Sequence, residues 1–180
     1  MRGILVSTLI AFAAAATLGA QTCREVIRDS SGRVVQTIER QRQAGGSERA
    51  VIRDASGRLT GTATTRASGG SASTQYRDAS GRLTGTATTQ PASGGASANT
   101  IYRDASGRLA GSAATRTSGG STSSTTQYRD ATGRLTGSAT THGGSTTRRD
   151  ASGRLIGTSA AGGRCTAPVK VPLPPASTRK

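Results

Sequence analysis

Apolar and polar residues alternate along most of the chain with a period of two. In the stretch 83–88, for example, Leu83, Gly85 and Ala87 share one face and threonines occupy the other. A period of two is typical of β-strands, and the Thr, Gly and Ser residues within every candidate segment disfavour helices. The pattern therefore predicts an all-β fold.

The strand pattern recurs in six copies of one unit, of which YRDASGRLTGTATT at residues 76–89 is an example. Each copy has Arg-Asp, then Gly three residues after the Asp, then Arg, then Leu or Val. The Asp side chain can accept backbone N–H groups and Gly adopts a positive φ without steric cost, so we expect strand, turn and strand in every copy. The predicted turn residues are Asp29, Gly32, Asp54, Gly57, Asp78, Gly81, Asp104, Gly107, Asp130, Gly133, Asp150 and Gly153.

The turn can close as a hairpin or as a β-arch. A hairpin with a type I turn and a Gly bulge pairs Asp78 with Arg82, and it places Tyr76 and Leu83 on opposite faces. Shifting the register sets Arg77 directly against Arg82, and like charges in that position are destabilising.

In an arch the two strands belong to different stacked sheets, so Tyr76 and Leu83 both point inward while the arginines point outward. The pattern therefore favours a repeat protein, a β-solenoid of six stacked β-arches, over an antiparallel hairpin meander or a disordered chain. The predicted core residues are Ile27, Val34, Ile52, Leu59, Tyr76, Leu83, Tyr102, Leu109, Tyr128, Leu135 and Leu155.

Two resemblances accompany the repeat. The words Y-R-D-A-S-G-R-L resemble the core of the YD repeats in Rhs-type shell proteins, and that likeness implies a hairpin ribbon. The overall plan is similar to that of curli-type fibre subunits: a signal peptide followed by a few degenerate strand–turn–strand units rich in Gly, Ser and Thr. This second likeness implies a secreted subunit of a β-rich fibre.

The ends of the chain differ in composition from the repeats. Residues 1–20 have a positive start, an apolar run and small residues at Leu18-Gly19-Ala20, which predicts a cleaved signal peptide; the alternative is a membrane anchor. The six-copy array spans 21–161, and a Pro-rich tail follows over 162–180. We therefore expect a secreted protein, extracellular or at the cell surface, with no membrane span after cleavage.

Cys23 and Cys165 flank the array. A pair of cysteines in an exported chain predicts a disulfide and not a metal site. If the arches stack head to tail, the bond joins one molecule to the next, whereas a closed meander favours a bond within one chain.

The formal net charge is +15 at pH 7, and every repeat carries two arginines for one aspartate. Arg makes bidentate contacts with carboxylate and phosphate, so a regular array of them could bind extracellular polyanions; the alternative is that they keep the protein soluble. The predicted polyanion-binding residues are Arg58, Arg82, Arg108, Arg134 and Arg154. Three tyrosines are too few for a stacking platform, so no specific nucleic-acid recognition is expected.

Catalytic chemistry has no support in this sequence. His142, the single histidine, lies in a Gly/Thr linker, and the repeated aspartates are identical copies, whereas acid–base pairs need different environments. We expect no enzyme, no catalytic residue, no metal site and no cofactor.

The sequence therefore favours a structural subunit that polymerises with itself by head-to-tail stacking into an extracellular filament, such as a functional-amyloid fibre of a biofilm matrix. The alternative is a monomeric, secreted, Arg-rich binding module for polyanions: anionic polysaccharide, lipopolysaccharide or extracellular DNA. A minor alternative is an ice-binding solenoid with an array of threonines.

Overall fold

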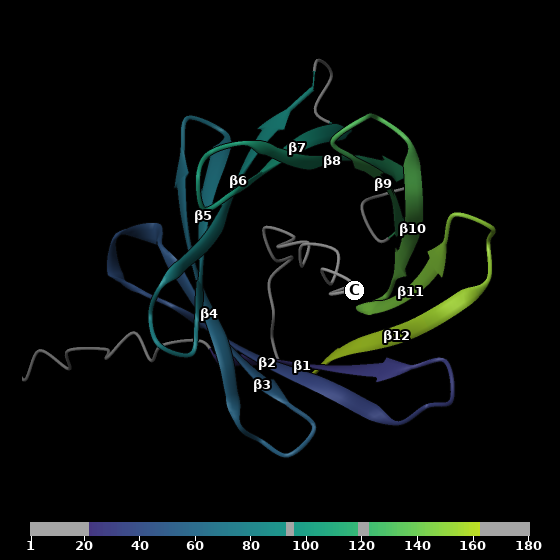
Figure 1. The fold of residues 1–180 in the computed structure, drawn as a ribbon, viewed down its shortest axis with the longest axis horizontal. Helices are drawn as coiled ribbons and strands as arrows, with labels where there is room; N and C mark the ends of the chain where they lie inside the picture. Colours follow the sequence, from purple (N-terminus) through teal and green to yellow (C-terminus); the bar gives the residue numbers. More distant parts are fainter. Residues whose placement is uncertain (1–21, 93–95, 119–122, 163–180) are drawn as a thin grey trace, which may run out of the picture.

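The computed structural model describes residues 22–92, 96–118 and 123–162. In these ranges, antiparallel strands follow one another around a single closed barrel (Figure 1). A short 3-10 helix, η1 (Ala44–Gly46), lies between the second and third strands. The strands are β1 (Thr22–Asp29), β2 (Val34–Arg42), β3 (Glu48–Asp54), β4 (Leu59–Ser68), β5 (Ser71–Asp78), β6 (Leu83–Pro91), β7 (Ser97–Asp104), β8 (Leu109–Ser118), β9 (Ser123–Asp130), β10 (Leu135–His142), β11 (Ser145–Asp150) and β12 (Leu155–Gly162).

The last strand pairs with the first, and this pairing closes the barrel. β1 and β12 run antiparallel, with Val26 opposite Ala160 and Arg24 opposite Gly162. The prediction of a solenoid of stacked arches is therefore wrong, and the open hairpin meander is wrong as well, although both were all-β. Closure gives every strand two partners, so the described barrel has no unpaired strand edge.

A β-bulge next to every turn resolves the conflict that argued against a hairpin. In the pair β5/β6, Arg77 is opposite Leu83 but Tyr76 is opposite Gly85, so Thr84 is an extra residue. The bulge brings Tyr76 and Gly85 to the inner face together and leaves Leu83 on the outer face beside Arg77. The same shift occurs in β1/β2, β3/β4, β7/β8, β9/β10 and β11/β12.

Small residues and a few large ones fill the inner face. Ala63, Ala87 and Ala113 are buried there with Tyr76 and Tyr102. Inward threonines of neighbouring strands also bond to each other through their hydroxyls, at 2.8–2.9 Å; the pairs are Thr65–Thr74, Thr89–Thr100, Thr115–Thr126 and Thr141–Thr146. Sequence analysis placed the repeat threonines outside and did not anticipate this inner set.

The leucines predicted as core residues lie elsewhere. Leu109 is 47% exposed. The others are half-buried, and each is the first residue of its strand: Val34, Leu59, Leu83, Leu135 and Leu155. Ile27, Ile52, Tyr76 and Tyr102, by contrast, are buried inside, and Tyr128 packs against them. The bulge explains the difference, because it changes the face on which the alternating pattern continues.

The glycine after each bulge allows a close approach of the neighbouring strand. A Cβ at Gly85 would lie 2.6 Å from the carbonyl oxygen of Arg103, and one at Gly61 would lie 2.5 Å from that of Arg77. The close approach is between neighbouring strands of one sheet, and not between the two stacked sheets of the predicted arches. β2 carries Gln36 at the equivalent position, so the pair β2/β3 accommodates a side chain there.

Cys23 is buried in β1, 8% exposed. Cys165 lies outside the described residues, so the predicted disulfide is not shown, either within or between chains. The predicted signal peptide and the tail after Gly162 also lie outside them.

Candidate anion-binding rim and wall groove

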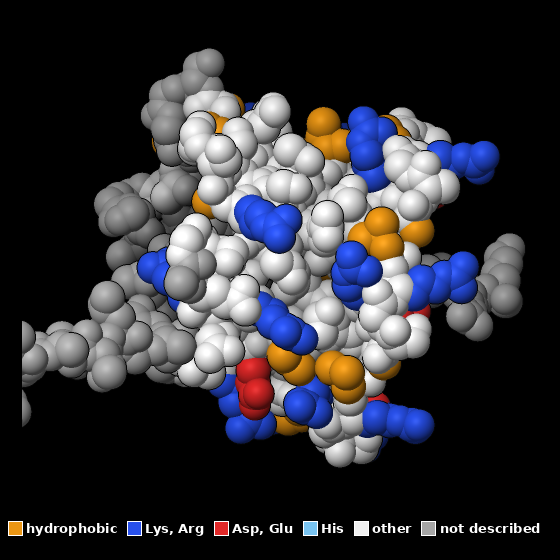
Figure 2. All heavy atoms as spheres, turned by 90° about the vertical axis from the view of Figure 1, so that its left-hand side faces the viewer, with side chains coloured by type: hydrophobic (Ala, Val, Ile, Leu, Met, Phe, Trp, Pro, Cys, Tyr) orange, Lys and Arg blue, Asp and Glu red, His pale blue; other side chains and the backbone are white. Residues whose placement is uncertain are grey.

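All six repeat turns lie at the same end of the barrel, because alternate connections of an up-and-down barrel share a rim. We call residues 28–33, 53–58, 77–82, 103–108, 129–134 and 149–154 the turn rim. In the side view of Figure 2, basic side chains project at the right-hand edge, and others lie across the face toward the viewer.

Each turn is a hydrogen-bonded turn closed by a left-handed glycine. In the β5/β6 turn, the Gly81 N–H donates to the Asp78 carbonyl oxygen (3.0 Å) and the Asp78 N–H donates to that of Arg82 (2.9 Å). Gly81 has φ 83°, which explains why glycine occupies this place in all six copies. The other predicted turn residues occupy equivalent positions with the same backbone bonds.

One carboxylate oxygen of the aspartate accepts hydrogen bonds from its own turn. Asp78 Oδ1 accepts from the Ser80 hydroxyl (2.7 Å), the Ser80 N–H (3.0 Å) and the Arg82 N–H (2.9 Å). The hydroxyl bond, followed by the Arg82 N–H bond, lowers the pKa of Asp78 below its ordinary value. The pKa of the other five turn aspartates is lowered as well, each chiefly by the hydroxyl two residues on.

The two arginines of each turn differ in their engagement. Arg77, before the aspartate, donates from Nη1 to the Gly81 carbonyl oxygen (2.8 Å), and its five equivalents do the same at 2.8–3.0 Å. The second arginine is exposed at every turn, and within the described residues its guanidinium makes no hydrogen bond or ion pair. These second arginines are Arg33, Arg58, Arg82, Arg108, Arg134 and Arg154.

The structure thus brings the five predicted polyanion-binding arginines together, but around a ring and not in a stacked ladder. Sequence analysis left out Arg33, whose copy departs most from the repeat, and the first arginine of every turn. The Arg-Asp motif identifies all of these arginines in the sequence. Whether they form one binding surface, however, depends on the turns lying at the same rim of the barrel.

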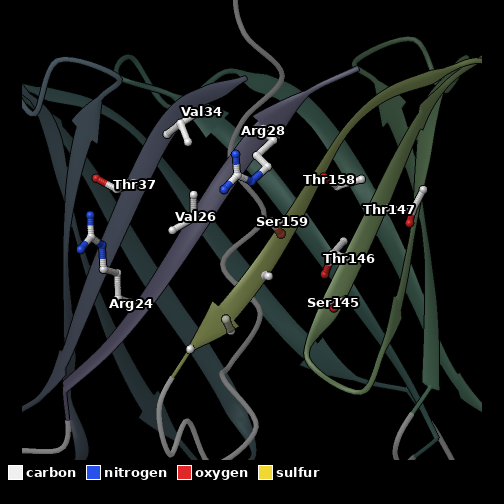
Figure 3. A pocket seen from close by; sticks show the side chains of 13 residues that line it. Arg24, Val26, Arg28, Val34, Thr37, Ser145, Thr146, Thr147, Thr158 and Ser159 are labelled. Atoms are coloured by element: carbon white, nitrogen blue, oxygen red, sulfur yellow. The ribbon is translucent and has the colours of Figure 1, made fainter. Parts of the chain in front are cut away.

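A groove lies on the outer wall where β11, β12, β1 and β2 meet (Figure 3). Its volume is about 860 Å³. Arg24, Val26 and Arg28 line it from the outer face of β1. The remaining lining residues are Val34, Thr37, Ser145, Thr146, Thr147, Thr158, Ser159, Ala160, Ala161 and Gly162. We call this the wall groove; nothing in the sequence pattern singled it out.

Inside the barrel, four charged side chains form an interior ion cluster. Arg40 Nη2 lies 2.7 Å from Glu25 Oε2, and its Nη1 lies 3.8 Å from Glu48 Oε1. Arg148 Nη2 lies 3.8 Å from Glu25 Oε1. The four residues differ from those at the equivalent positions of most other copies. Arg148, for example, stands in the sixth copy where three other copies have tyrosine.

Burial on the inner face perturbs the three tyrosines of the repeats. Burial raises the pKa of Tyr76, Tyr102 and Tyr128 above the usual value of a phenol. Tyr102 is 3% exposed, and among the described residues neither its hydroxyl nor Arg40 Nε has a hydrogen-bond partner.

Within the described ranges, no group of three or more His, Cys, Asp or Glu residues could hold a metal ion. His142 is exposed at the end of β10. No helix in these ranges is long and apolar enough to span a membrane.

Comparison of the sequence with protein-family models gives no match, and comparison with curated proteins gives none either. Among solved structures, the fold is similar to a crystal structure of a protein from Parabacteroides distasonis ATCC 8503 that is provisionally classed as a lipoprotein. The TM-score is 0.44 with 10% sequence identity, over 79% of this chain and 94% of the other. This likeness carries no argument about function, so the proposals below rest on the site.

Proposed function

We propose that this protein is an exported binding module for polyanions and that the turn rim is its binding surface. The observation that carries the proposal is that the three charged residues of each turn differ in their hydrogen bonds. The aspartate is held by backbone and hydroxyl donors, the first arginine is bound to the turn, and the second guanidinium is left for a ligand. A ring of such guanidinium groups fits a chain of carboxylate, sulfate or phosphate groups.

Solubility alone explains the rim less well. Charges that only keep a protein soluble can be spread over its surface, whereas here six equivalent guanidinium groups recur at one end. Each turn also carries one more positive than negative charge. The export itself is an inference from residues 1–20 of the sequence.

The filament that sequence analysis favoured is not proposed. Its growth required the last strand of one molecule to pair with the first of the next, and in the closed barrel β12 pairs with β1 of the same chain. The outer threonines lie on a curved, twisted wall, so they do not offer the flat array that ice binding needs.

The test compares two variants with the same change in charge. The rim variant replaces Arg58, Arg82, Arg108 and Arg134 by Gln. The control variant replaces four exposed arginines toward the opposite end of the barrel by Gln: Arg42, Arg49, Arg66 and Arg116. Affinity for alginate, polyphosphate and double-stranded DNA is measured over a range of NaCl concentrations, with circular dichroism as the check of folding.

We expect the rim variant to lose at least about tenfold in affinity. Its affinity should also depend less steeply on salt, because a polyanion that makes fewer contacts with arginine releases fewer counterions on binding. The control variant should stay close to the wild type. Equal losses in both variants would show that binding follows net charge and not the rim, and failure of the wild type to bind any of the three polyanions would overturn the proposal.

A further inference from the structure

We propose that the wall groove binds one acidic sugar unit of a polysaccharide chain that also contacts the turn rim. The proposal rests on the proposed function and deepens it, since it selects acidic polysaccharide among the polyanions.

The groove is continuous with the turn rim through Arg28. This residue donates from Nη1 to the Gly32 carbonyl oxygen, as the first arginine of a turn, and it also lines the groove. Its remaining N–H groups can face a ligand there. Arg24 lies on the same face of β1, four residues away, which is roughly 13 Å along a strand. The groove therefore offers a cation at each end.

Between the two arginines the surface is partly apolar and partly hydroxylated. Val26 lies opposite Ala160 of β12 and Thr37 of β2. Thr147 lies opposite Thr158, so hydroxyls border the apolar strip on both sides. A sugar ring has C–H faces and hydroxyl edges, and its carboxylate or sulfate is suited to a guanidinium fork.

The equivalent part of the wall at β3 has similar strand residues but larger neighbours. Arg49, Val51 and Arg53 repeat the outward residues of β1. Val51, however, lies opposite Thr62 and Glu39, whereas Val26 has Ala160 on its β12 side. Arg24 likewise faces Gly162, which has no side chain. The small residues of β12 thus hollow the wall at one place, within reach of two arginines.

A nucleic acid is less suited to this groove. Single strands are held by bases stacking on aromatic rings, and none of the described residues that line the groove is aromatic. The pKa-shifted tyrosines belong to the inner face, where Tyr76 is 5% and Tyr102 is 3% exposed.

The test uses the full secreted protein and two probes of equal charge: an oligosaccharide of alginate, which has uronate rings, and a linear polyphosphate, which has no rings or hydroxyl-bearing carbons. Three single variants alter the groove. Ala160→Leu fills it, Thr158→Val removes a hydroxyl at constant volume, and Arg24→Gln removes one cation. Arg49→Gln is the matched control on β3.

We expect the three groove variants to lose about five- to tenfold in affinity for the alginate oligosaccharide, because each loses one contact or the space for the ring. Affinity for polyphosphate should change less than about twofold, and Arg49→Gln should leave both affinities unchanged. Thr158→Val keeps the inference testable should Ala160→Leu fold poorly.

The outcomes separate this inference from the proposed function. If the wild type binds both probes but the groove variants lose neither or lose both equally, the groove is not a sugar site and the rim proposal stands. The same holds if the wild type binds polyphosphate and DNA but no uronate. If the wild type binds none of the probes, both proposals fall.

Discussion

Asp78 and its five equivalents are among the residues that all six copies of the repeat share, and their role is to build a turn. The same carboxylate oxygen accepts two backbone N–H groups and one hydroxyl. Sequence analysis anticipated the turn residues, since an Asp followed three positions later by a Gly is a local signal. It could not anticipate that the neighbouring hydroxyl residue, Ser80 here and Thr132 in the fifth copy, is the largest cause of the lowered aspartate pKa.

The first prediction concerns acid. Because the folded state lowers the pKa of the turn aspartates, it holds their ionised form more firmly than the unfolded chain does. Their stabilisation is therefore present above the unfolded pKa of about 3.9 and is lost as the pH falls through the lower folded pKa. We expect the urea midpoint of unfolding to be constant near neutral pH and to fall below about pH 4.

A matched variant isolates this contribution. Replacing Asp54, Asp78 and Asp104 by Asn keeps an oxygen that can accept the turn hydrogen bonds but removes the titrating group. The acid limb of the urea midpoint should become shallower than in the wild type. An unchanged limb would mean that the turn aspartates do not cause the loss of stability in acid.

At the scale of the element, the hairpin with its bulge is the unit that repeats. Sequence analysis considered a hairpin with this turn and its Gly bulge and set it aside, because Tyr76 and Leu83 then fall on opposite faces. That conclusion about the faces was correct, since Leu83 does lie outside. The error was to place Leu83 in the core, on the ground that large apolar residues are usually buried. In the structure Gly85, opposite Tyr76, is the residue on the inner face.

A bulge is hard to predict from alternation alone. It adds one residue to one strand, and the residue added here, Thr84, continues the alternating pattern without a visible break. The glycine that follows is the only local sign, and a strand glycine has several explanations. In this barrel its explanation is the approach of the neighbouring strand's carbonyl oxygen.

The second prediction follows from that approach. Gly85→Ala should lower the free energy of unfolding by about 1–2 kcal/mol, because the new Cβ meets the Arg103 carbonyl oxygen at 2.6 Å and the gain in backbone rigidity only partly offsets the strain. The control is Thr86→Ala, next along β6 on the outer face, which should cost less than about 0.5 kcal/mol. Urea unfolding of both variants gives the comparison.

The presence of Gln36 at the equivalent position of β2 limits the expected loss at Gly85. That strand pair accepts a side chain, so the neighbouring strand can move by a small amount. A Gly85→Ala variant as stable as Thr86→Ala would show that the strands adjust freely and that the glycine serves only the bulge.

At the scale of the whole molecule, the first and last copies close the barrel. Their departures from the repeat can be identified in the sequence, but the role of these departures cannot. The structure places Glu25, Arg40 and Arg148 together on the inner face across the closing strands. Closure depends on residues more than a hundred positions apart, so no local pattern could have distinguished it from an open array.

The interior ion cluster leads to the last prediction. Arg40 is 7% exposed in its side chain and is shared by Glu25 and Glu48, which are 13% and 18% exposed. Arg40→Leu should destabilise the barrel by about 3–5 kcal/mol in urea unfolding, because two carboxylates then remain inside without their main partner.

The matched design replaces the whole cluster by the residues that other copies carry at these places: Glu25→Thr, Arg40→Thr, Glu48→Ala and Arg148→Tyr. The attraction between buried paired charges is only slightly larger than the free-energy cost of removing them from water. Replacing the whole cluster should therefore recover most of the lost stability. A single Arg40→Leu variant that loses less than about 1 kcal/mol, or a fourfold variant less stable than it, would contradict this account.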